Sequence, residues 1–199
     1  MIIAVEGIDG AGKNTLVSAV RQATGAEVLS FPRYDDSLPA QLAADALRGR
    51  MGDLMDSAYA MATLFALDRA GVVDKLNSFR SDGVILLDRY VASNAAYTWA
   101  RTGDEAVVDF LGELEFERIG LPVPDLQVLL ATDPQEAGRR AQRRAVVDKR
   151  REKDAYEQDS SLQERTYDAY CALAQRQWYS PWEVTSDAER ILARIDALR

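Results

Sequence analysis

Histidine is absent from the 199-residue chain, and cysteine occurs once, at Cys171. Without histidine, the chain has no imidazole for general acid–base catalysis or for binding a metal. One cysteine allows no internal disulfide and is too few for a zinc site. Any catalysis must therefore use carboxylates, lysine, arginine, hydroxyls and backbone groups. We expect a cytoplasmic protein, because the cytoplasm is a reducing compartment.

Long apolar runs are missing as well, since no stretch approaches the roughly 18 residues that a membrane-spanning helix requires. The chain also lacks an overall positive charge. Its formal net charge of −8 argues against broad contact with a nucleic acid. We therefore expect neither a membrane nor a nucleic acid among its partners.

Positive charge is concentrated in one segment, residues 139–153, which carries eight Lys and Arg against two acidic residues. This segment sums to +6 and the rest of the chain to −14, a contrast that favours a small anionic ligand over a long polyanion. Arg139 and Arg143 are four residues apart, as are Arg140 and Arg144, so a helix would place them on neighbouring rows. We predict a basic lid at about 139–153 that closes over phosphates. The alternative is a solvent-exposed basic helix face.

Short apolar segments alternate with longer helical patterns along the chain. Residues 84–87 and 128–130 are continuously apolar, which is typical of strands covered on both faces. The alternation predicts an α/β fold, with a five-stranded parallel sheet flanked by helices, in a single domain of residues 1–199. We expect strands at 2–6, 27–30, 84–88, 126–131 and 182–185, and helices at 13–24, 40–48, 56–78, 92–101, 104–118, 134–145, 155–177 and 187–198.

A glycine-rich loop, GIDGAGKNT at residues 7–15, follows the first expected strand and opens a helix. Glycine lets successive backbone N–H groups turn toward phosphate oxygens, and the helix N-terminus adds partial positive charge. Lys13 can reach the outer phosphates. The loop therefore predicts a nucleoside triphosphate site, formed by Gly7, Gly10, Ala11, Gly12, Lys13, Asn14 and Thr15.

The loop departs from the usual pattern at the position after its lysine, where a Ser or Thr hydroxyl normally binds Mg²⁺. Asn14 stands there, and the hydroxyl comes one residue later, at Thr15. We therefore expect Mg²⁺ to depend on carboxylates and phosphate oxygens, with Asp9 the nearest candidate. Asp88 ends an apolar strand, at the sheet edge where open α/β folds bind ligands, and can support Mg²⁺ through water. Alternatively, Asp88 caps the next helix. Arg89, beside it, can hold a substrate phosphate.

Five segments resemble bacterial thymidylate kinases, and the actinobacterial branch is the most similar. They are GIDGAGK (7–13), FPRY (31–34), DR (68–69), DRYVASN (88–94) and DAYE (154–157). Their order and approximate spacing resemble the family from residue 1 to about residue 180, whereas a generic nucleotide kinase would share only the phosphate loop and the fold. The resemblance implies a phosphate-loop nucleotide kinase fold, ATP-dependent conversion of dTMP to dTDP in dTTP biosynthesis, Mg²⁺ as cofactor and a homodimer.

The resemblance also implies residue roles. Phe65 should stack on thymine, and Arg69 and Asn94 should hydrogen-bond the base edge. The expected dTMP site comprises Asp9, Phe31, Arg33, Tyr34, Phe65, Arg69, Arg89, Ser93, Asn94, Tyr97, Asp154 and Tyr156. The expected catalytic residues are Lys13, Asp9, Arg89, Arg140, Arg144 and Arg151, and the expected metal-binding residues are Asp9, Asp88 and Glu157.

Ordinary structural roles remain open for several of these residues when each is considered alone. Phe65 could be a core residue of an amphipathic helix, and Asp68 with Arg69 a surface ion pair. Tyr34 and Tyr97 could be half-buried tyrosines without a binding role. Only their joint order favours the family site.

Many eukaryotic members carry an arginine in the phosphate loop, where this chain has Gly10, so the basic segment must supply that charge. Which of its arginines meets the transferred phosphate stays open. Two other functions also stay open: another nucleoside monophosphate or deoxynucleoside kinase, and a catalytically silent nucleotide-binding module. Asn14 is the one feature that favours the silent module.

Overall fold

A five-stranded, all-parallel sheet forms the centre of the molecule. The computed structural model describes residues 1–79, 83–147 and 154–198. The strand order is β2-β3-β1-β4-β5, and every neighbouring pair is parallel. The expected α/β fold with a five-stranded parallel sheet is therefore confirmed. The strands are β1 (Ile2–Glu6), β2 (Glu27–Ser30), β3 (Ile85–Asp88), β4 (Leu126–Leu129) and β5 (Trp182–Val184).

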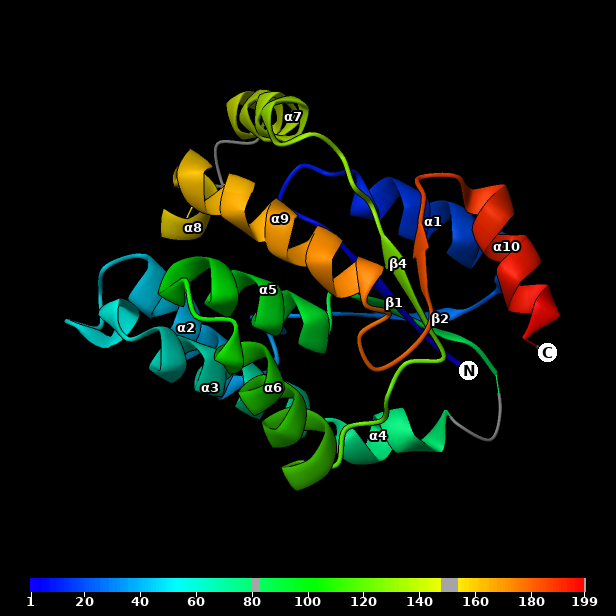
Figure 1. The fold of residues 1–199 in the computed structure, drawn as a ribbon, viewed down its shortest axis with the longest axis horizontal. Helices are drawn as coiled ribbons and strands as arrows, with labels where there is room; N and C mark the ends of the chain where they lie inside the picture. Colours follow the sequence, from blue (N-terminus) through cyan, green and yellow to red (C-terminus); the bar gives the residue numbers. More distant parts are fainter. Residues whose placement is uncertain (80–82, 148–153, 199) are drawn as a thin grey trace.

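Helices cover both faces of this sheet (Figure 1). On one face, α1 (Lys13–Thr24) packs against α10 (Ala188–Ala197) and against β1, β2 and β3. On the other face, α5 (Val91–Thr102) packs against α9 (Ser160–Gln175), which also contacts β5. Strand β1 is buried along its whole length between these layers, which accounts for its continuous apolar run.

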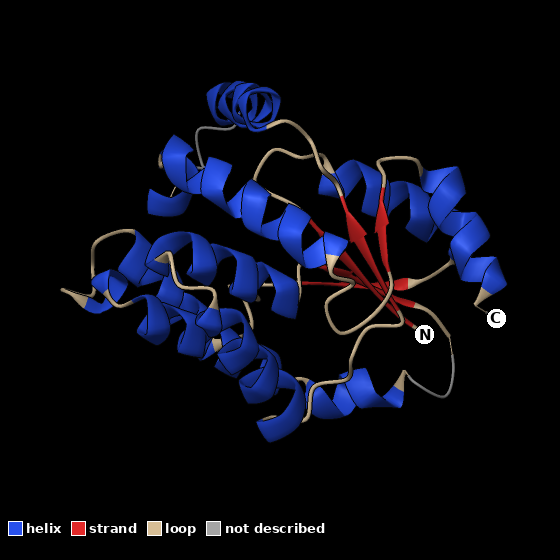
Figure 2. Cartoon of the chain, in the orientation of Figure 1, coloured by secondary structure: helices blue, strands red, loops and turns tan. Residues whose placement is uncertain are grey.

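The remaining helices lie mostly around the ends of the sheet (Figure 2). Helix α3 packs against α2 and α5, and α6 packs against α5. In the described part of the chain, no helix is long and apolar enough to cross a membrane. These helices are α2 (Leu38–Leu47), α3 (Ala58–Ala70), α4 (Val73–Ser78), α6 (Ala106–Gly112), α7 (Pro134–Val147) and α8 (Ala155–Gln158), with a short 3₁₀ turn at Leu54–Asp56.

Three expected helices are interrupted. The segment 56–78 divides into α3 and α4 at Gly71, where Arg33 Nη2 donates to the backbone oxygen of Asp68 at 2.6 Å and the N–H of Val72 bonds to Arg69 instead. The segment 155–177 divides at Asp159, whose backbone is extended and whose carboxylate accepts the N–H of Leu162 as a helix cap. Predicting these segments as single helices was wrong, because neither a tertiary contact nor a capping bond alters the apolar periodicity.

The third expected helix, 104–118, changes type rather than stopping. Helix α6 continues directly into a π-helical turn, Glu113–Arg118. In this turn Glu113 and Glu117 are exposed, whereas Glu115 is fully buried. Such turns are rare and often occur at functional sites.

Candidate active site

A cavity of about 830 Å³ opens at the carboxyl edge of the sheet. The loop after β1 and the residue after β3 meet there, because the two strands are neighbours and run parallel. Helices α2, α3, α5 and α8 supply the other walls. The predicted residues that line it are Asp9, Gly10, Gly12, Lys13, Asn14, Phe31, Tyr34, Phe65, Arg69, Asp88, Arg89, Ser93, Asn94, Tyr97, Asp154, Tyr156 and Glu157, whereas Gly7, Ala11, Thr15, Arg33 and Arg140 are not part of its wall.

The loop 7–15 has the backbone of a phosphate cradle. Its three glycines all adopt positive φ, which other residues rarely do: 145° at Gly7, 86° at Gly10 and 105° at Gly12. The ammonium group of Lys13 donates to the carbonyl oxygens of Gly7 and Ile8, at 3.0 and 3.1 Å. Burial, with the nearby charge of Arg89, lowers the pKa of Lys13 to about 8.

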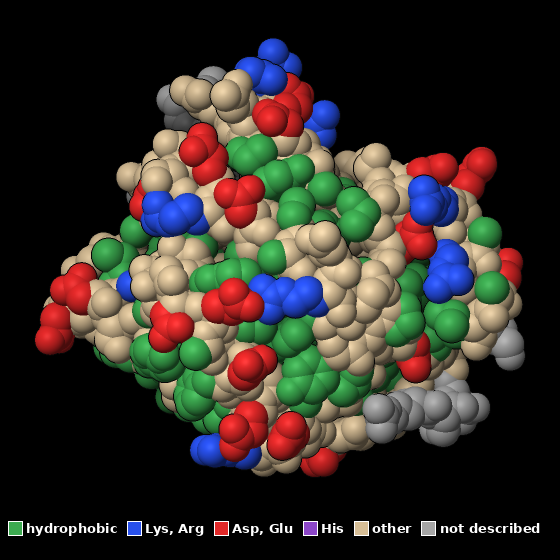
Figure 3. All heavy atoms as spheres, viewed as in Figure 1, with side chains coloured by type: hydrophobic (Ala, Val, Ile, Leu, Met, Phe, Trp, Pro, Cys, Tyr) green, Lys and Arg blue, Asp and Glu red, His purple; other side chains and the backbone are tan. Residues whose placement is uncertain are grey.

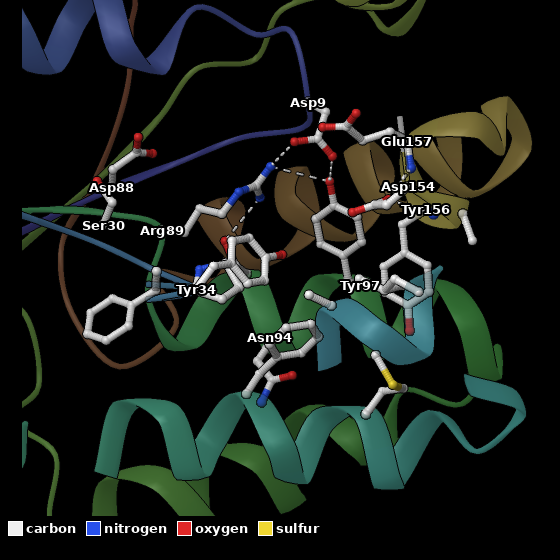
Figure 4. Close-up of a pocket in the computed structure, with 18 of the residues that line it drawn as sticks. Asp9, Ser30, Tyr34, Asp88, Arg89, Asn94, Tyr97, Asp154, Tyr156 and Glu157 are labelled. Carbon is white, nitrogen blue, oxygen red and sulfur yellow. Dashed lines mark hydrogen bonds and ion pairs between the residues drawn. The ribbon is translucent and has the colours of Figure 1, made fainter. Parts of the chain in front are cut away.

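Arg89 joins the end of β3 to this loop (Figure 4). Its Nη2 donates to Oδ1 of Asp9 at 2.5 Å, and the hydroxyl of Tyr97 donates to Oδ2 of Asp9 at 2.7 Å. Burial opposes ionisation of Asp9, but Arg89 and Lys13 outweigh it and lower its pKa to about 2. Asp9 is thus an anion at neutral pH. Arg89 itself has a φ of 67°, a strained conformation that is frequent at functional sites.

A second, buried carboxylate lies behind Arg89. Glu6 is fully buried and accepts hydrogen bonds from Ser93 Oγ at 2.6 Å and from Tyr170 Oη at 3.2 Å. Arg89 Nη1 in turn donates to Ser93 Oγ at 3.3 Å and to Tyr170 Oη at 3.4 Å. Glu6 therefore orients the two hydroxyls that accept hydrogen bonds from Arg89. Sequence reasoning missed Glu6, although it ends an apolar strand just as Asp88 does.

A third buried carboxylate lies at the other end of the cavity. Arg69 is 3% exposed and donates to Glu115 through Nε, at 2.5 Å, and through Nη2, at 2.8 Å. Asn94 Nδ2 also donates to Glu115, at 2.8 Å. Phe65 lines the same cavity and packs, half-buried, against the small apolar cluster that includes Met61.

Asp68 pairs with Arg33, not with its neighbour Arg69. Arg33 Nε donates to Oδ1 of Asp68 at 3.0 Å, and the backbone N–H of Arg33 donates to Oδ2, also at 3.0 Å. The surface ion pair considered for Asp68 and Arg69 is therefore wrong, since both side chains are buried in different pairs. Arg33 supports the segment that brings Phe31 and Tyr34 to the cavity, and its direct contact with substrate stays a prediction.

The segment after the basic region closes one side of the cavity. The carboxylate of Asp154 accepts the N–H groups of Tyr156 and Glu157, both at 2.9 Å, and so begins α8. The ring of Tyr156 stacks on Tyr97, with centroids 6.0 Å apart. Arg101, a residue that sequence reasoning missed, donates to the Tyr156 hydroxyl at 2.5 Å.

The basic segment is described only in part. Arg139 and Arg140, both exposed, pair with Glu136 at 2.7 and 2.9 Å. Nη1 of Arg140 lies 3.8 Å from the position that a Cβ on Gly12 would occupy, so it approaches the phosphate loop. The side chain of Arg144 and all of Arg151 lie outside the described residues. The choice between a lid and a basic helix face therefore stays open for them.

The carboxylates of the cavity fit a loosely held Mg²⁺ ion. Asp9, Asp88 and Glu157 line the cavity, but in the described ranges no three acidic side chains converge as a ready-made metal cage. Mg²⁺ usually takes one or two carboxylates together with substrate phosphates and water. Helix α5 has Tyr90 as its N-terminal cap residue, so the alternative role of Asp88 as that cap is wrong.

Comparison with known proteins identifies the chain. The sequence model of the family described as "Thymidylate kinase" matches residues 5–195. The chain belongs to the thymidylate kinase family. This kinase is 50% identical to the thymidylate kinase of Mycobacterium tuberculosis, over 98% of the chain and 97% of that protein. It is 32% identical to a probable thymidylate kinase of Thermococcus onnurineus, over 88% of the chain and 85% of that protein.

Solved structures share the fold of this kinase. Candida albicans thymidylate kinase aligns with a TM-score of 0.71 at 19% identity, covering 99% of this chain and 89% of that one. Deoxyadenosine kinase from M. mycoides aligns with a TM-score of 0.70 at 17% identity, covering 99% and 100%. At these identities the likeness shows the fold alone. The activity, that of an ATP-dependent dTMP kinase, rests on the family and the full-length relatives, and the predicted function is confirmed.

Proposed function

We propose that this thymidylate kinase binds dTMP and ATP at opposite ends of its cavity, and that the phosphoryl group passes where loop 7–15 meets Arg89. The observation that carries the proposal is the 2.5 Å ion pair between Arg89 and Asp9, which joins the two halves of the cavity. Lys13, on the loop, lies within the electrostatic reach of both residues. A cluster of this kind neutralises two approaching anionic phosphates, which is the main task in phosphoryl transfer.

The dTMP end comprises Phe65, Arg69, Asn94, Tyr97 and Arg89. Phe65 offers a ring on which thymine can stack, a contact worth about 1–3 kcal/mol for a base. Arg69 and Asn94 read the base edge. Tyr97 is beside the sugar, and Arg89 holds the phosphate. An oxygen of this phosphate attacks the γ-phosphorus of ATP, the bond from that phosphorus to the β–γ bridging oxygen breaks, and ADP leaves.

The ATP end is formed by the N–H groups of loop 7–15 and by Lys13. Asp9, Asp88 and Glu157 are the residues that would hold Mg²⁺, which would supply positive charge to the triphosphate. We place residues 1–199 in one kinase domain whose lid, about 139–153, brings arginines to the same phosphates. Arg140 is the described lid arginine that approaches the loop.

A panel of acceptors tests the proposal: dTMP, dUMP, dCMP and dAMP, each with ATP. We expect the highest kcat/KM for dTMP. In Lys13→Ala we expect turnover to disappear while the circular dichroism spectrum and the cooperative thermal melt persist. Equal rates for all four acceptors, or a fully active Lys13→Ala, would contradict the proposal.

The expected homodimer has a candidate surface on α3 and α6. Tyr59 and Leu67 of α3 are 45% and 48% exposed, and the Tyr59 ring meets that of Phe110 of α6 at 5.5 Å. Figure 3 shows hydrophobic side chains reaching the surface over these helices. We expect Leu67→Asp to sediment as a monomer. Leu198→Asp changes a similarly exposed leucine at the far end of the fold and should remain a dimer.

A further inference from the structure

Glu115 lies behind the proposed base site and contacts both side chains that face the base. Its Oε1 accepts from Arg69 and from Asn94, and its Oε2 accepts from Arg69. The carboxylate is completely buried. We propose that Glu115 is a specificity-determining positioning residue, which sets the donors and acceptors that Arg69 and Asn94 present to the base. This inference rests on the proposed placement of dTMP.

The orientation of the Asn94 amide depends on Glu115. Both hydrogens of Nδ2 are used, one by the carbonyl oxygen of Ala62 at 2.9 Å and one by Glu115 at 2.8 Å. A flipped amide would turn its oxygen toward two other oxygens, and so would lose both bonds and gain repulsion. Figure 4 shows the nitrogen directed toward α3 and the oxygen away from it. Because Asn94 lines the cavity, its Oδ1 is held there as an acceptor.

Glu115 also fixes Arg69. The bidentate pair uses Nε and one hydrogen of Nη2, which leaves the second hydrogen of Nη2 and the two hydrogens of Nη1. In the described part of the chain no acceptor faces Nη1, and Arg69 lines the cavity. Burial alone would lower the pKa of Arg69, but Glu115 raises it, so the guanidinium remains a charged donor.

An acceptor beside a donor matches one edge of the pyrimidine ring. In thymine, N3–H donates and O4 accepts, so Asn94 Oδ1 and Arg69 Nη1 are complementary to it. In cytosine, N3 accepts and the 4-amino group donates, so both contacts become mismatched. A site whose buried polar groups would be left unpaired rejects the wrong base by large factors. Uracil has the same edge as thymine, so Glu115 has no means of separating dUMP from dTMP.

The backbone delivers Glu115 to this position. Val107, Leu111 and Glu115 follow one another at four-residue intervals, and all three are buried. The π-helical turn begins at Glu113, just after α6, and continues that face inward. A carboxylate on an apolar face is costly to bury unless it is paired, and Arg69 and Asn94 supply the partners.

The test compares Glu115→Gln with Glu113→Gln. In Glu115→Gln an NH₂ group replaces one carboxylate oxygen, and it would face N–H groups of Arg69 and Asn94 that now donate to Glu115. Because two donors cannot bond to each other, the Asn94 amide is no longer held and is free to flip. Glu113 lies on the same turn but is exposed and pairs only with Arg118 among the described residues, at 2.6 Å. In Glu115→Gln we expect kcat/KM to fall about tenfold or more for both dTMP and dUMP, mainly through KM, with dCMP little changed. In Glu113→Gln the ratios of kcat/KM among dTMP, dUMP and dCMP should equal those of the wild type.

Several outcomes overturn the proposal. One is a folded Glu115→Gln with an unchanged ratio of dTMP to dCMP; another is an equal loss for all three nucleotides, which indicates packing alone. If Glu115→Gln has no cooperative melt, Glu115→Asp decides. It keeps the charge but reaches fewer partners, so the ratio of kcat/KM for dTMP to that for dCMP should fall below the wild-type value, and an unchanged ratio in folded Glu115→Asp overturns the proposal. If neither folds, NMR of the wild type decides, since rapid water exchange of the Asn94 side-chain N–H groups overturns the proposal. A wild type that does not prefer dTMP to dCMP contradicts the proposed function instead.

Discussion

The carbonyl oxygen of Ala137, in helix α7, occupies the space that a side chain on Gly10 would need. The phosphate loop and the first turn of the basic helix are therefore packed backbone against backbone. Gly10 also has a φ of 86°, which side chains disfavour. An arginine at this position, as eukaryotic relatives carry it, would not fit beneath α7. The packing of α7 on the loop therefore leaves no room for a side chain at Gly10.

Gly10→Ala should consequently lower the activity more than the strain of a positive φ alone would. We expect kcat/KM to fall about a hundredfold, because displacement of the loop by about 1 Å misplaces the reacting phosphates. Gly49→Ala is the matched control, since Gly49 has a φ of 73° but no atom near the new Cβ. Steady-state kinetics and thermal melts of both variants check this. If the two variants behave alike, the contact with Ala137 has no role.

Arg140 and Arg139 form a second natural comparison. Both are exposed and both pair with Glu136, but the described contacts bring only Arg140 near Gly12. An arginine that neutralises a transferring phosphoryl group contributes about 10³–10⁵ in rate. We expect Arg140→Ala to lower kcat by about 10³ and Arg139→Ala to stay within about twofold. Equal effects in single-turnover measurements would assign the role to arginines further along the chain.

The sheet was predictable from the sequence, whereas the ends of several helices were not. Strand β1 is apolar from Ile2 to Val5 because both of its faces are covered, and that pattern is visible without a structure. At the break by Gly71, the backbone oxygen of Asp68 accepts from Arg33, which is distant in sequence, while the N–H of Val72 bonds to Arg69 instead. The break at Asp159 depends on a hydrogen bond to Leu162. A tertiary contact and a capping bond leave little trace in hydrophobic periodicity.

The cavity residues divide in the same way. Asp9 and Arg89 were predictable at the same edge of the sheet because each follows the carboxyl end of a strand. That they are neighbours follows from the pairing of β1 with β3, which the structure supplied. Glu115 was missed, although an acid four residues after Leu111 interrupts an apolar stripe and is a usable signal. Its partner Arg69 lies 46 residues away, so its role could be found only from the fold.

The pKa of Lys13, lowered to about 8 by burial and by Arg89, predicts a pH dependence of ATP binding. The charged form predominates below pH 8 and attracts the phosphates, so affinity is lost as the pH rises through 8. Above that value the apparent Kd for ATP should rise about tenfold per pH unit. Titration calorimetry from about pH 7.5 to 9.5 measures this. Lys13→Arg stays charged throughout, and its weaker binding should be flat. A wild-type Kd for ATP that does not change over this pH range would contradict the lowered pKa of Lys13.

Asp9→Asn should separate the two roles of the Asp9 carboxylate. As the partner of Arg89 and Tyr97, Asp9 holds the dTMP phosphate site, so its loss should raise the KM for dTMP. As a residue of loop 7–15 that we expect to bind Mg²⁺, it should also affect the Mg²⁺ concentration needed for half-maximal rate. We expect the KM for dTMP and the required Mg²⁺ concentration to rise, and kcat/KM to fall about a hundredfold, because an amide keeps one acceptor but loses the charge.

Asp88→Asn is the matched comparison for this metal role. Asp88 also lines the cavity, but in the described part of the chain no ion pair joins it to Arg89. Its substitution should raise the Mg²⁺ requirement without raising the KM for dTMP. Magnesium titrations at fixed ATP, run for both variants, distinguish the cases. If Asp9→Asn changes only the KM for dTMP, then Asp88, Glu157 or Asn14 carries the ion, and Asp9 serves to hold Arg89.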